Sequence, residues 1–256
     1  MISVPLVRYV LMAALRDRLI LSLILLIAVG TCLSVFTASA AVIEKSQFTI
    51  VFAASGLRMA GVVGLVLFAV FHIRRSFDNR DVDFLLSRPI SRSGFILSHA
   101  IAFSLLALLL AAVTGLVILL LTFRGAGAGD ALWVLGLTME FIIVVNAALF
   151  FAMVISSASG AALAVFGLYI LSRLMGQLLG DAAANYGNPA VNSVLKIIMD
   201  IVAMVTPRLD LMTQTTWLVY PDIPQNVSVA FILAQGVIYT SLLLAATLVD
   251  LRRRQF

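Results

Sequence analysis

The chain has 256 residues, of which 62% are hydrophobic and only 11% are charged, whereas soluble domains average about 45–50% apolar and about 25% charged residues. A soluble fold of this length cannot hide so much apolar surface, so the composition excludes a soluble enzyme, a nucleic-acid-binding protein and a disordered chain. The net charge of +5 is carried mostly by arginine and indicates membrane topology, with no nucleic-acid partner.

The chain begins with an amphipathic segment, residues 4–18. Val7, Val10, Leu11 and Ala14 recur there at helical spacing among charged residues. This pattern predicts a helix that lies in the membrane interface and leads into the first span.

Six later segments are long and apolar enough to cross the hydrocarbon core as helices, which takes about 20 residues each. They cover residues 19–43, 50–73, 95–123, 131–155, 161–180 and 226–249. The fourth and fifth are separated only by the turn-like residues 156–160, which predict a tight helical hairpin. The predicted fold class is therefore an all-α membrane protein with six transmembrane helices in a single domain, residues 1–256.

The basic residues predict the orientation of these spans. If both termini are cytoplasmic, eleven basic residues lie on the cytoplasmic side and four on the other side. We therefore expect both termini to be cytoplasmic. The cytoplasmic set is Arg8, Arg16, Arg18, Arg74, Arg75, Arg80, Arg88, Arg92, Arg252, Arg253 and Arg254.

The loop at residues 74–93, between the second and third spans, carries the most specific sequence. Residues 78–87 could form a short helix whose first turn, with Asp78 and Asp81, is acidic, which is favourable at a helix N-terminus, and Pro89 would end it. Leu85 and Leu86 add an apolar stripe. A short amphipathic helix on the cytoplasmic face suits docking into a groove of another protein, and the alternative is a solvated loop held by lipid headgroups.

Three charged residues, Arg58, Glu140 and Arg173, lie deep within the predicted spans. Each is about 10–13 Å from the outer end of its helix, and intramembrane charges are candidates for function. Glu140 could neutralise one arginine and leave the other for an anionic group, with Asn146 extending a polar path. The alternative is an ion pair that only fixes helix packing.

The longest outer connection, residues 181–225, contains one further amphipathic helix. Its apolar residues from Val191 to Val205 face away from Asn192, Lys196 and Asp200, and Pro207 marks its end. We expect an interfacial or re-entrant helix on the outer side of the membrane.

Several motifs are absent. Neither lysine follows a glycine, so the chain has no P-loop with which to bind ATP itself. The single cysteine, Cys32, and the two histidines predict no metal site. We also expect no catalytic residues in this chain.

The chain resembles the permease subunits of ABC-2-type transporters. In that family an acidic loop after the second span runs into a Leu-Leu-Ser-x-Pro-x-Ser-Arg signature, and this chain has Leu85-Leu86-Ser87-Arg88-Pro89-Ile90-Ser91-Arg92. The likeness extends to the N-terminal helix, the six spans, the helix before the last span and the Arg-rich tail. It departs at Ser98-His99, where the family commonly has Gly-Lys.

The resemblance implies that a separate ABC ATP-binding subunit binds ATP and Mg, while this chain binds no cofactor and exports an unidentified substrate. It implies a second permease subunit, either a copy of this chain or a related one, and residence as a multi-pass protein in the bacterial cytoplasmic (inner) membrane. The loop would be the coupling helix that contacts the ATPase. Its expected coupling residues are Asp78, Arg80, Asp81, Val82, Asp83, Leu85, Leu86, Arg88, Pro89 and Arg92.

Two other functions are open. In the first, the same ATP-driven movement acts mechanically on an extracytoplasmic partner through residues 181–225, and nothing crosses the membrane. The second is an intramembrane enzyme, since Gly127-Ala128-Gly129-Asp130 has the Gly-x-Gly-Asp form of intramembrane aspartyl proteases. That chemistry needs a facing second carboxylate, and no predicted span supplies a partner aspartate.

Overall fold

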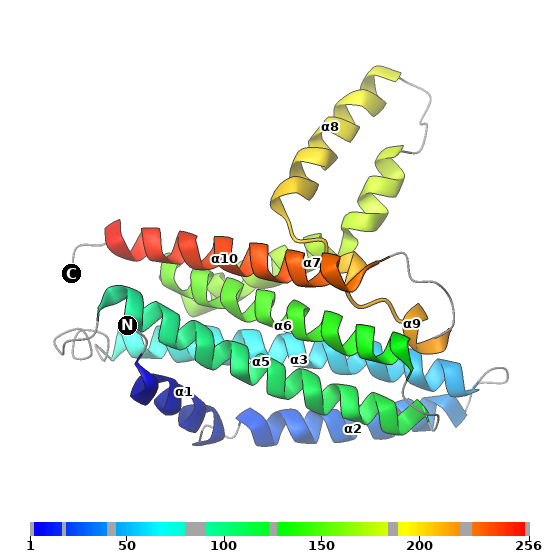
Figure 1. Ribbon diagram of the computed structural model, residues 1–256, viewed down its shortest axis with the longest axis horizontal. Helices are drawn as coiled ribbons and strands as arrows, with labels where there is room; N and C mark the ends of the chain where they lie inside the picture. Colours follow the sequence, from blue (N-terminus) through cyan, green and yellow to red (C-terminus); the bar gives the residue numbers. More distant parts are fainter. Residues whose placement is uncertain are drawn as a thin grey trace.

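The computed structural model describes residues 3–16, 19–39, 45–79, 91–122, 127–183, 189–220 and 227–253, and every regular element in these ranges is a helix. Most of the helices form one elongated bundle, shown in Figure 1. In chain order they are α1 (Val4–Arg16), α2 (Leu19–Ser39), α3 (Lys45–Asp78), α5 (Arg92–Thr122), α6 (Ala128–Val154), α7 (Ala158–Ala183), α8 (Pro189–Val205), η1 (Leu209–Leu211), α9 (Thr216–Val219) and α10 (Val229–Arg253).

Five of these helices, α3, α5, α6, α7 and α10, are long and apolar enough to cross a membrane. Their apolar stretches are between 23 and 32 residues long, and about 20 residues suffice. The chain is therefore an all-helical, multi-pass membrane protein. The predicted first span overlaps α2, which has 21 residues and packs beside α3 but is not among the five helices of membrane-spanning length and apolarity in the described part of the chain.

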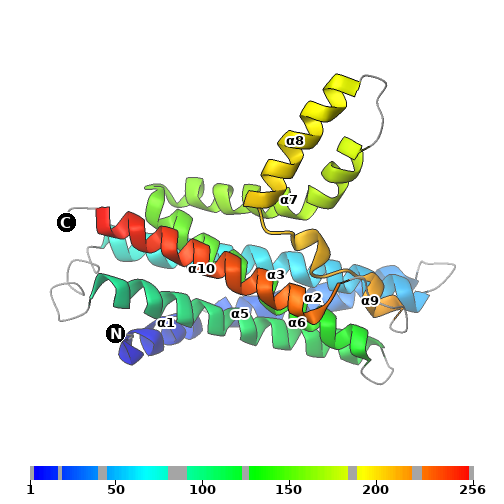
Figure 2. The same cartoon turned by 45° about the horizontal axis from the view of Figure 1, so that its top comes forward.

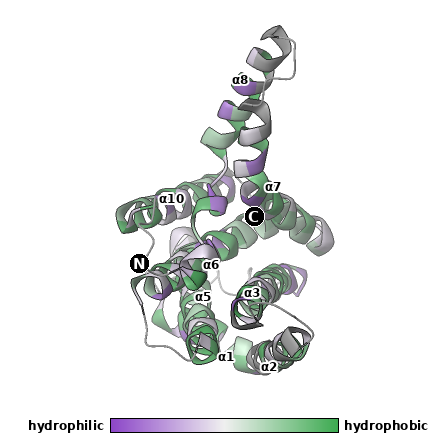
Figure 3. Ribbon diagram, turned by 90° about the vertical axis from the view of Figure 1, so that its right-hand side faces the viewer, coloured by the Kyte–Doolittle hydropathy of each residue, from purple (hydrophilic) through white to green (hydrophobic). Residues whose placement is uncertain are grey.

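Helix α6 is the centre of the bundle. It contacts α3, α5, α7 and α10, and the view along the bundle in Figure 3 shows it among α3, α5 and α10. Apolar residues lie on every side of this helix, which is typical of a helix buried on all its faces. Helices α3 and α6 approach closely at Gly61 of α3, where a Cβ atom would lie 2.5 Å from the ring of Phe141 on α6.

Helix α1 packs against the beginning of α5 and against α2. Leu6, Val10 and Ala14 are buried there, and the main-chain N–H of Ser3 donates a hydrogen bond to Ser98 Oγ at 2.9 Å. The predicted amphipathic helix is thus present, with its apolar stripe on the protein.

The two ends of the bundle differ in what they carry. Helix α1 begins and α10 ends at one end, here called the terminal end, and α3 ends and α5 begins there as well (Figure 1). Helices α2 and α5 end, and α3 and α6 begin, toward the opposite end, where α9 also lies (Figure 1). Both chain ends therefore lie on the same side of the bundle.

Helices α7 and α8 form an arm that leaves the bundle. Helix α7 bends, and its last part runs beside α8 away from the other helices (Figure 2). Helix α8 exposes apolar side chains, with Ile197, Ile201 and Met204 between 59% and 84% exposed. It ends at Val205, two residues before Pro207.

Residues 206–220, here called the re-entrant segment, run from the arm back onto the bundle. They contain η1 and α9, which contact α7, α6 and α3, and they bury Leu209, Met212, Thr213, Trp217 and Leu218. The re-entrant part therefore follows the amphipathic helix α8, which itself stands out as an arm.

Candidate functional site

The three intramembrane charges come together in the bundle. Glu140 on α6 lies between Arg58 on α3 and Arg173 on α7, with Arg58 Nε 3.9 Å from Glu140 Oε1 and Arg173 Nη1 3.8 Å from Glu140 Oε2. The side chain of Glu140 is fully buried, and those of Arg58 and Arg173 are 10% and 22% exposed. We call these three residues the ionic centre.

Two hydroxyl groups complete the shell of the Glu140 carboxylate. Tyr169 on α7 donates to Oε1 at 2.8 Å, and Thr213 donates to Oε2 at 2.5 Å. Each oxygen thus accepts one hydrogen bond and faces one guanidinium, as a buried carboxylate requires.

The re-entrant segment supplies the remaining partners of both arginines. The main-chain carbonyl of Thr213 accepts from Arg58 Nη1 at 3.1 Å and from Arg173 Nη2 at 3.0 Å. The carbonyl of Leu209 accepts from Arg173 Nη1 at 2.6 Å. Because one carboxylate faces two guanidinium groups, these carbonyl oxygens offset the second positive charge.

Thr213 joins all three charges. Its hydroxyl donates to Glu140 and accepts from Arg58 Nη1 at 3.2 Å and from Arg173 Nη1 at 2.9 Å. The ionic centre consequently connects three long helices to the re-entrant segment through one residue.

Two glycines allow the segment to come this close. A Cβ atom on Gly136 of α6 would collide with the carbonyl oxygen of Met212, and one on Gly176 of α7 would lie 2.6 Å from Asp210 Oδ2. Asp210 also accepts from Arg208 Nε at 3.0 Å and from Arg208 Nη2 at 2.9 Å. These hydrogen bonds from Arg208 to Asp210 raise the pKa of Arg208.

Helix α10 holds the beginning of the re-entrant segment, where this segment follows α8. The hydroxyl of Tyr239 donates to the carbonyl of Thr206 at 2.8 Å and to that of Met204 at 3.2 Å. The re-entrant segment is thus held by α10 where it begins and by the ionic centre in its middle.

Both arginines donate hydrogen bonds within the protein in this arrangement. Both guanidinium groups donate to the re-entrant segment, and the cavity that borders Tyr169 and Leu209 has only about 10 Å³, about the space that one water needs. In this arrangement main-chain carbonyls, which leave no mark in the sequence, accept the hydrogen bonds that a spare arginine would donate to an anionic group.

Asn146 does not join the ionic centre. It lies six residues after Glu140, which turns it by about 240° around α6, and its amide donates to the carbonyl of Ile142 at 2.8 Å and to Ser104 Oγ on α5 at 3.3 Å. Its Oδ1 has no hydrogen-bond partner among the described residues. The expected polar path from Glu140 through Asn146 is therefore not formed.

The expected coupling residues lie mostly outside the described residues, which stop at Asn79 and resume at Ser91. Asp78 belongs to the last turn of α3, where it pairs with Arg74 at 3.5 Å. It therefore continues α3 and does not begin a separate helix. Arg92 is the first residue of α5. The loop residues outside the described part are Arg80, Asp81, Val82, Asp83, Leu85, Leu86, Arg88 and Pro89.

Asp130, the aspartate of the Gly-x-Gly-Asp string, has a structural role. Its Oδ2 accepts a hydrogen bond from the main-chain N–H of Gly127 at 2.8 Å, in the first turn of α6, where an anion also stabilises the helix. The described residues include no group of three or more His, Cys, Asp or Glu side chains placed to hold a metal ion.

Two partners of the ionic centre, Tyr169 and Thr213, were not foreseen from the sequence. Tyr169 precedes Arg173 by four residues and so shares its helix face, which was the one usable signal. Thr213 lies in a segment without apolar periodicity, and nothing in the sequence connects it to Glu140.

A scan against protein-family models and a search of curated proteins each found no match to this chain.

Proposed function

We propose that the chain is the membrane-spanning permease subunit of an ABC-2-type transporter and couples ATP hydrolysis by a separate subunit to export of a substrate. The observation that carries this proposal is the signature from Leu85 to Arg92, which connects two membrane-length helices, α3 and α5.

The topology supports the proposal. If α2, about 31 Å long at 1.5 Å per residue, is a further span beside the five membrane-length helices, the chain would cross six times. The end of α3 and the beginning of α5, which flank the signature, then share the terminal end with the beginning of α1 and the end of α10 (Figure 1), and the basic residues of the sequence are predicted to lie mostly on this side. This end would face the cytoplasm of a bacterial cell.

Helix α3 offers a route for coupling. It is one helix of 34 residues, and Asp78 at its terminal end lies about 30 Å from Arg58 along the axis. An ATPase that moves the loop would displace α3 as one rigid helix, and this displacement would move Arg58 relative to Glu140. Movement of the loop would therefore loosen the contacts between the ionic centre and the re-entrant segment.

The permease would bind no cofactor of its own, and ATP and Mg would be held by the ATP-binding subunit. A second permease subunit, either a copy of this chain or a related one, would complete the pathway. The bilayer would surround the exposed apolar faces of α3, α7 and α10.

Co-purification with the ATP-binding subunit tests the proposal. We expect the intact chain to recover that subunit from membranes, and the double variant Leu85→Ala, Leu86→Ala to recover about tenfold less, because an amphipathic helix docks into a groove through its apolar anchor residues. Leu15→Ala is the matched control, since Leu15 is an exposed leucine of α1. Failure to recover an ATPase with the intact loop, or equal recovery in the loop variant and the control, would count against the proposal.

A second candidate function is a mechanical one, in which ATP-driven movement acts on an extracytoplasmic partner and nothing is exported. The arm formed by α7 and α8 favours it, because Ile197 and Ile201 of α8 are 59% and 60% exposed. In this case Ile197→Ser with Ile201→Ser would release the partner and leave recovery of the ATPase unchanged. Leu163→Ser, at an exposed position of α7 within the bundle, is the control.

A further inference from the structure

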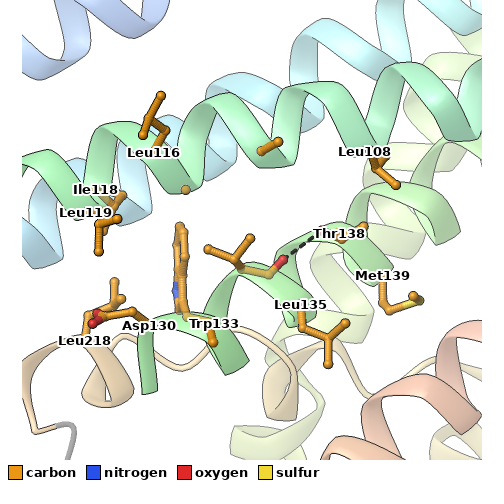
Figure 4. A pocket seen from close by; sticks show the side chains of 14 residues that line it. Leu108, Leu116, Ile118, Leu119, Asp130, Trp133, Leu135, Thr138, Met139 and Leu218 are labelled. Carbon is orange, nitrogen blue, oxygen red and sulfur yellow. Dashed lines mark hydrogen bonds between the residues drawn. The ribbon is translucent and has the colours of Figure 1, made fainter. Parts of the chain in front are cut away.

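A cavity lies between α5 and α6, apart from the ionic centre. It has a volume of about 750 Å³, within the range of about 300–1,000 Å³ that is typical of ligand pockets. Figure 4 shows its wall, to which α5 contributes Leu108, Leu116 and Leu119 and α6 contributes Trp133, Leu135 and Met139. We call it the α5–α6 groove.

The wall is almost entirely apolar, and two of its polar groups already have partners. The Thr138 hydroxyl donates to the carbonyl of Val134 at 2.8 Å, as drawn in Figure 4, and Asp130 accepts from the main chain of Gly127. A ligand of this groove must therefore be mainly hydrocarbon.

Trp133 is the exception. Its side chain is fully buried, yet its indole Nε1 has no hydrogen-bond partner in the part of the chain that the structure describes. The ring stands between α5 and α6 in Figure 4. A buried N–H without an acceptor is unfavourable, so a ligand that brings a carbonyl oxygen to this position would be stabilised.

The groove opens sideways, toward the surface that meets lipid. Leu108 and Leu116 at its border are 52% and 57% exposed. From Leu108 to Leu119 it follows α5 for about 16 Å, a length that suits a long acyl chain. Trp133 lies about 8 Å along α6 from its first residue, near the end of the bundle, where indole groups meet the polar part of a lipid.

We propose that the α5–α6 groove binds one acyl chain of a membrane lipid, with an ester carbonyl of that lipid accepting a hydrogen bond from Trp133 Nε1. The occupant is a lipid because the groove is apolar, opens to the bilayer and ends at a hydrogen-bond donor. The proposal does not depend on transport or on an ATPase.

The two tryptophans of the chain make the test direct. In the variant Trp217→Phe, Trp133 is the remaining tryptophan, and its fluorescence is measured in vesicles of ordinary phosphatidylcholine and of phosphatidylcholine brominated near the glycerol end of its acyl chains. We expect strong quenching by the brominated lipid, even though Trp133 is fully buried within the protein.

A blocking variant separates a chain in the groove from lipid at the protein surface. Ala112→Phe, at an exposed position of the groove wall, fills the groove, and most of the quenching should be lost. Ala245→Phe is the matched control at an exposed position of α10 and should be quenched like its parent. Equal quenching in the blocking and control variants, or no quenching in the parent, would overturn the proposal.

The hydrogen bond is tested separately by the mass of phosphatidylcholine that stays bound to the purified protein in detergent. Trp133→Phe keeps an aromatic ring but removes the donor, so lipid retention should fall about fivefold. Retention equal to that of wild type would contradict the role of Nε1. The measurement of lipid retention also tests the proposed lipid site if Ala112→Phe does not fold.

Discussion

At the scale of single residues, the ionic centre is asymmetric, because one carboxylate serves two guanidinium groups. Glu140→Gln would leave Arg58 and Arg173 without their anion, and we expect the free energy of unfolding to fall by about 3–5 kcal/mol. Arg173→Gln would leave a balanced pair of charges and should cost about 1–3 kcal/mol. Denaturant or thermal unfolding in matched detergent measures both variants.

Asp200→Asn is the control for these changes, because Asp200 lies exposed on α8 and should tolerate the loss of its charge. If Arg173→Gln destabilises the protein as much as Glu140→Gln, the balance of charges does not account for the stability of the ionic centre.

Thr213 allows a finer test, because its hydroxyl and its main-chain carbonyl act separately. Thr213→Val keeps the shape and the carbonyl but removes the hydroxyl that donates to Glu140, so it should destabilise the protein by about 1–3 kcal/mol. Thr213→Ser keeps the hydroxyl and should remain near wild type. If the valine and serine variants unfold alike, the hydroxyl contributes nothing and the carbonyl alone holds the segment.

At the scale of helices and loops, the long helices were largely predictable and the contacts of the re-entrant segment were not. A run of apolar residues sufficed to predict α3, α5, α6, α7 and α10, although α3 extends from Lys45 to Asp78 because polar residues continue a helix beyond the apolar core. The depths of Arg58, Glu140 and Arg173 followed from counting residues along those helices. The contacts of Thr213 could not be predicted, because they depend on main-chain carbonyls and on the space at Gly136.

Because the ionic centre binds the re-entrant segment, loss of Glu140 should make buried residues of that segment accessible to thiol reagents. In a Cys32→Ser background, Met212→Cys introduces a thiol at a fully buried position beside Thr213. A membrane-impermeant thiol reagent should label it slowly, and labelling should be about tenfold faster when Glu140→Gln is added, since lost buried contacts favour local opening.

Met153→Cys is the matched control, because Met153 is equally buried in α6 but lies far along the helix from Glu140. Its labelling should not respond to Glu140→Gln. If both cysteines become reactive together, the substitution unfolds the bundle as a whole and does not release the segment.

At the scale of the whole molecule, the bundle places α1 and the end of α10 at the terminal end (Figure 1), and the distribution of arginine predicts that this end is cytoplasmic. In the Cys32→Ser background, Arg8→Cys on α1 and Thr216→Cys on α9 place exposed thiols toward opposite ends of the bundle. In intact cells an impermeant reagent should label only the cysteine at 216, and the cysteine at 8 should react once the membrane is permeabilised. The reverse labelling pattern would mean that the chain has the opposite orientation in the membrane. The signature loop would then lie outside the cell, where no ATP-binding subunit could reach it. Labelling of both cysteines in intact cells would mean that the number of crossings between α1 and α9 differs from the five that α2, α3, α5, α6 and α7 would make.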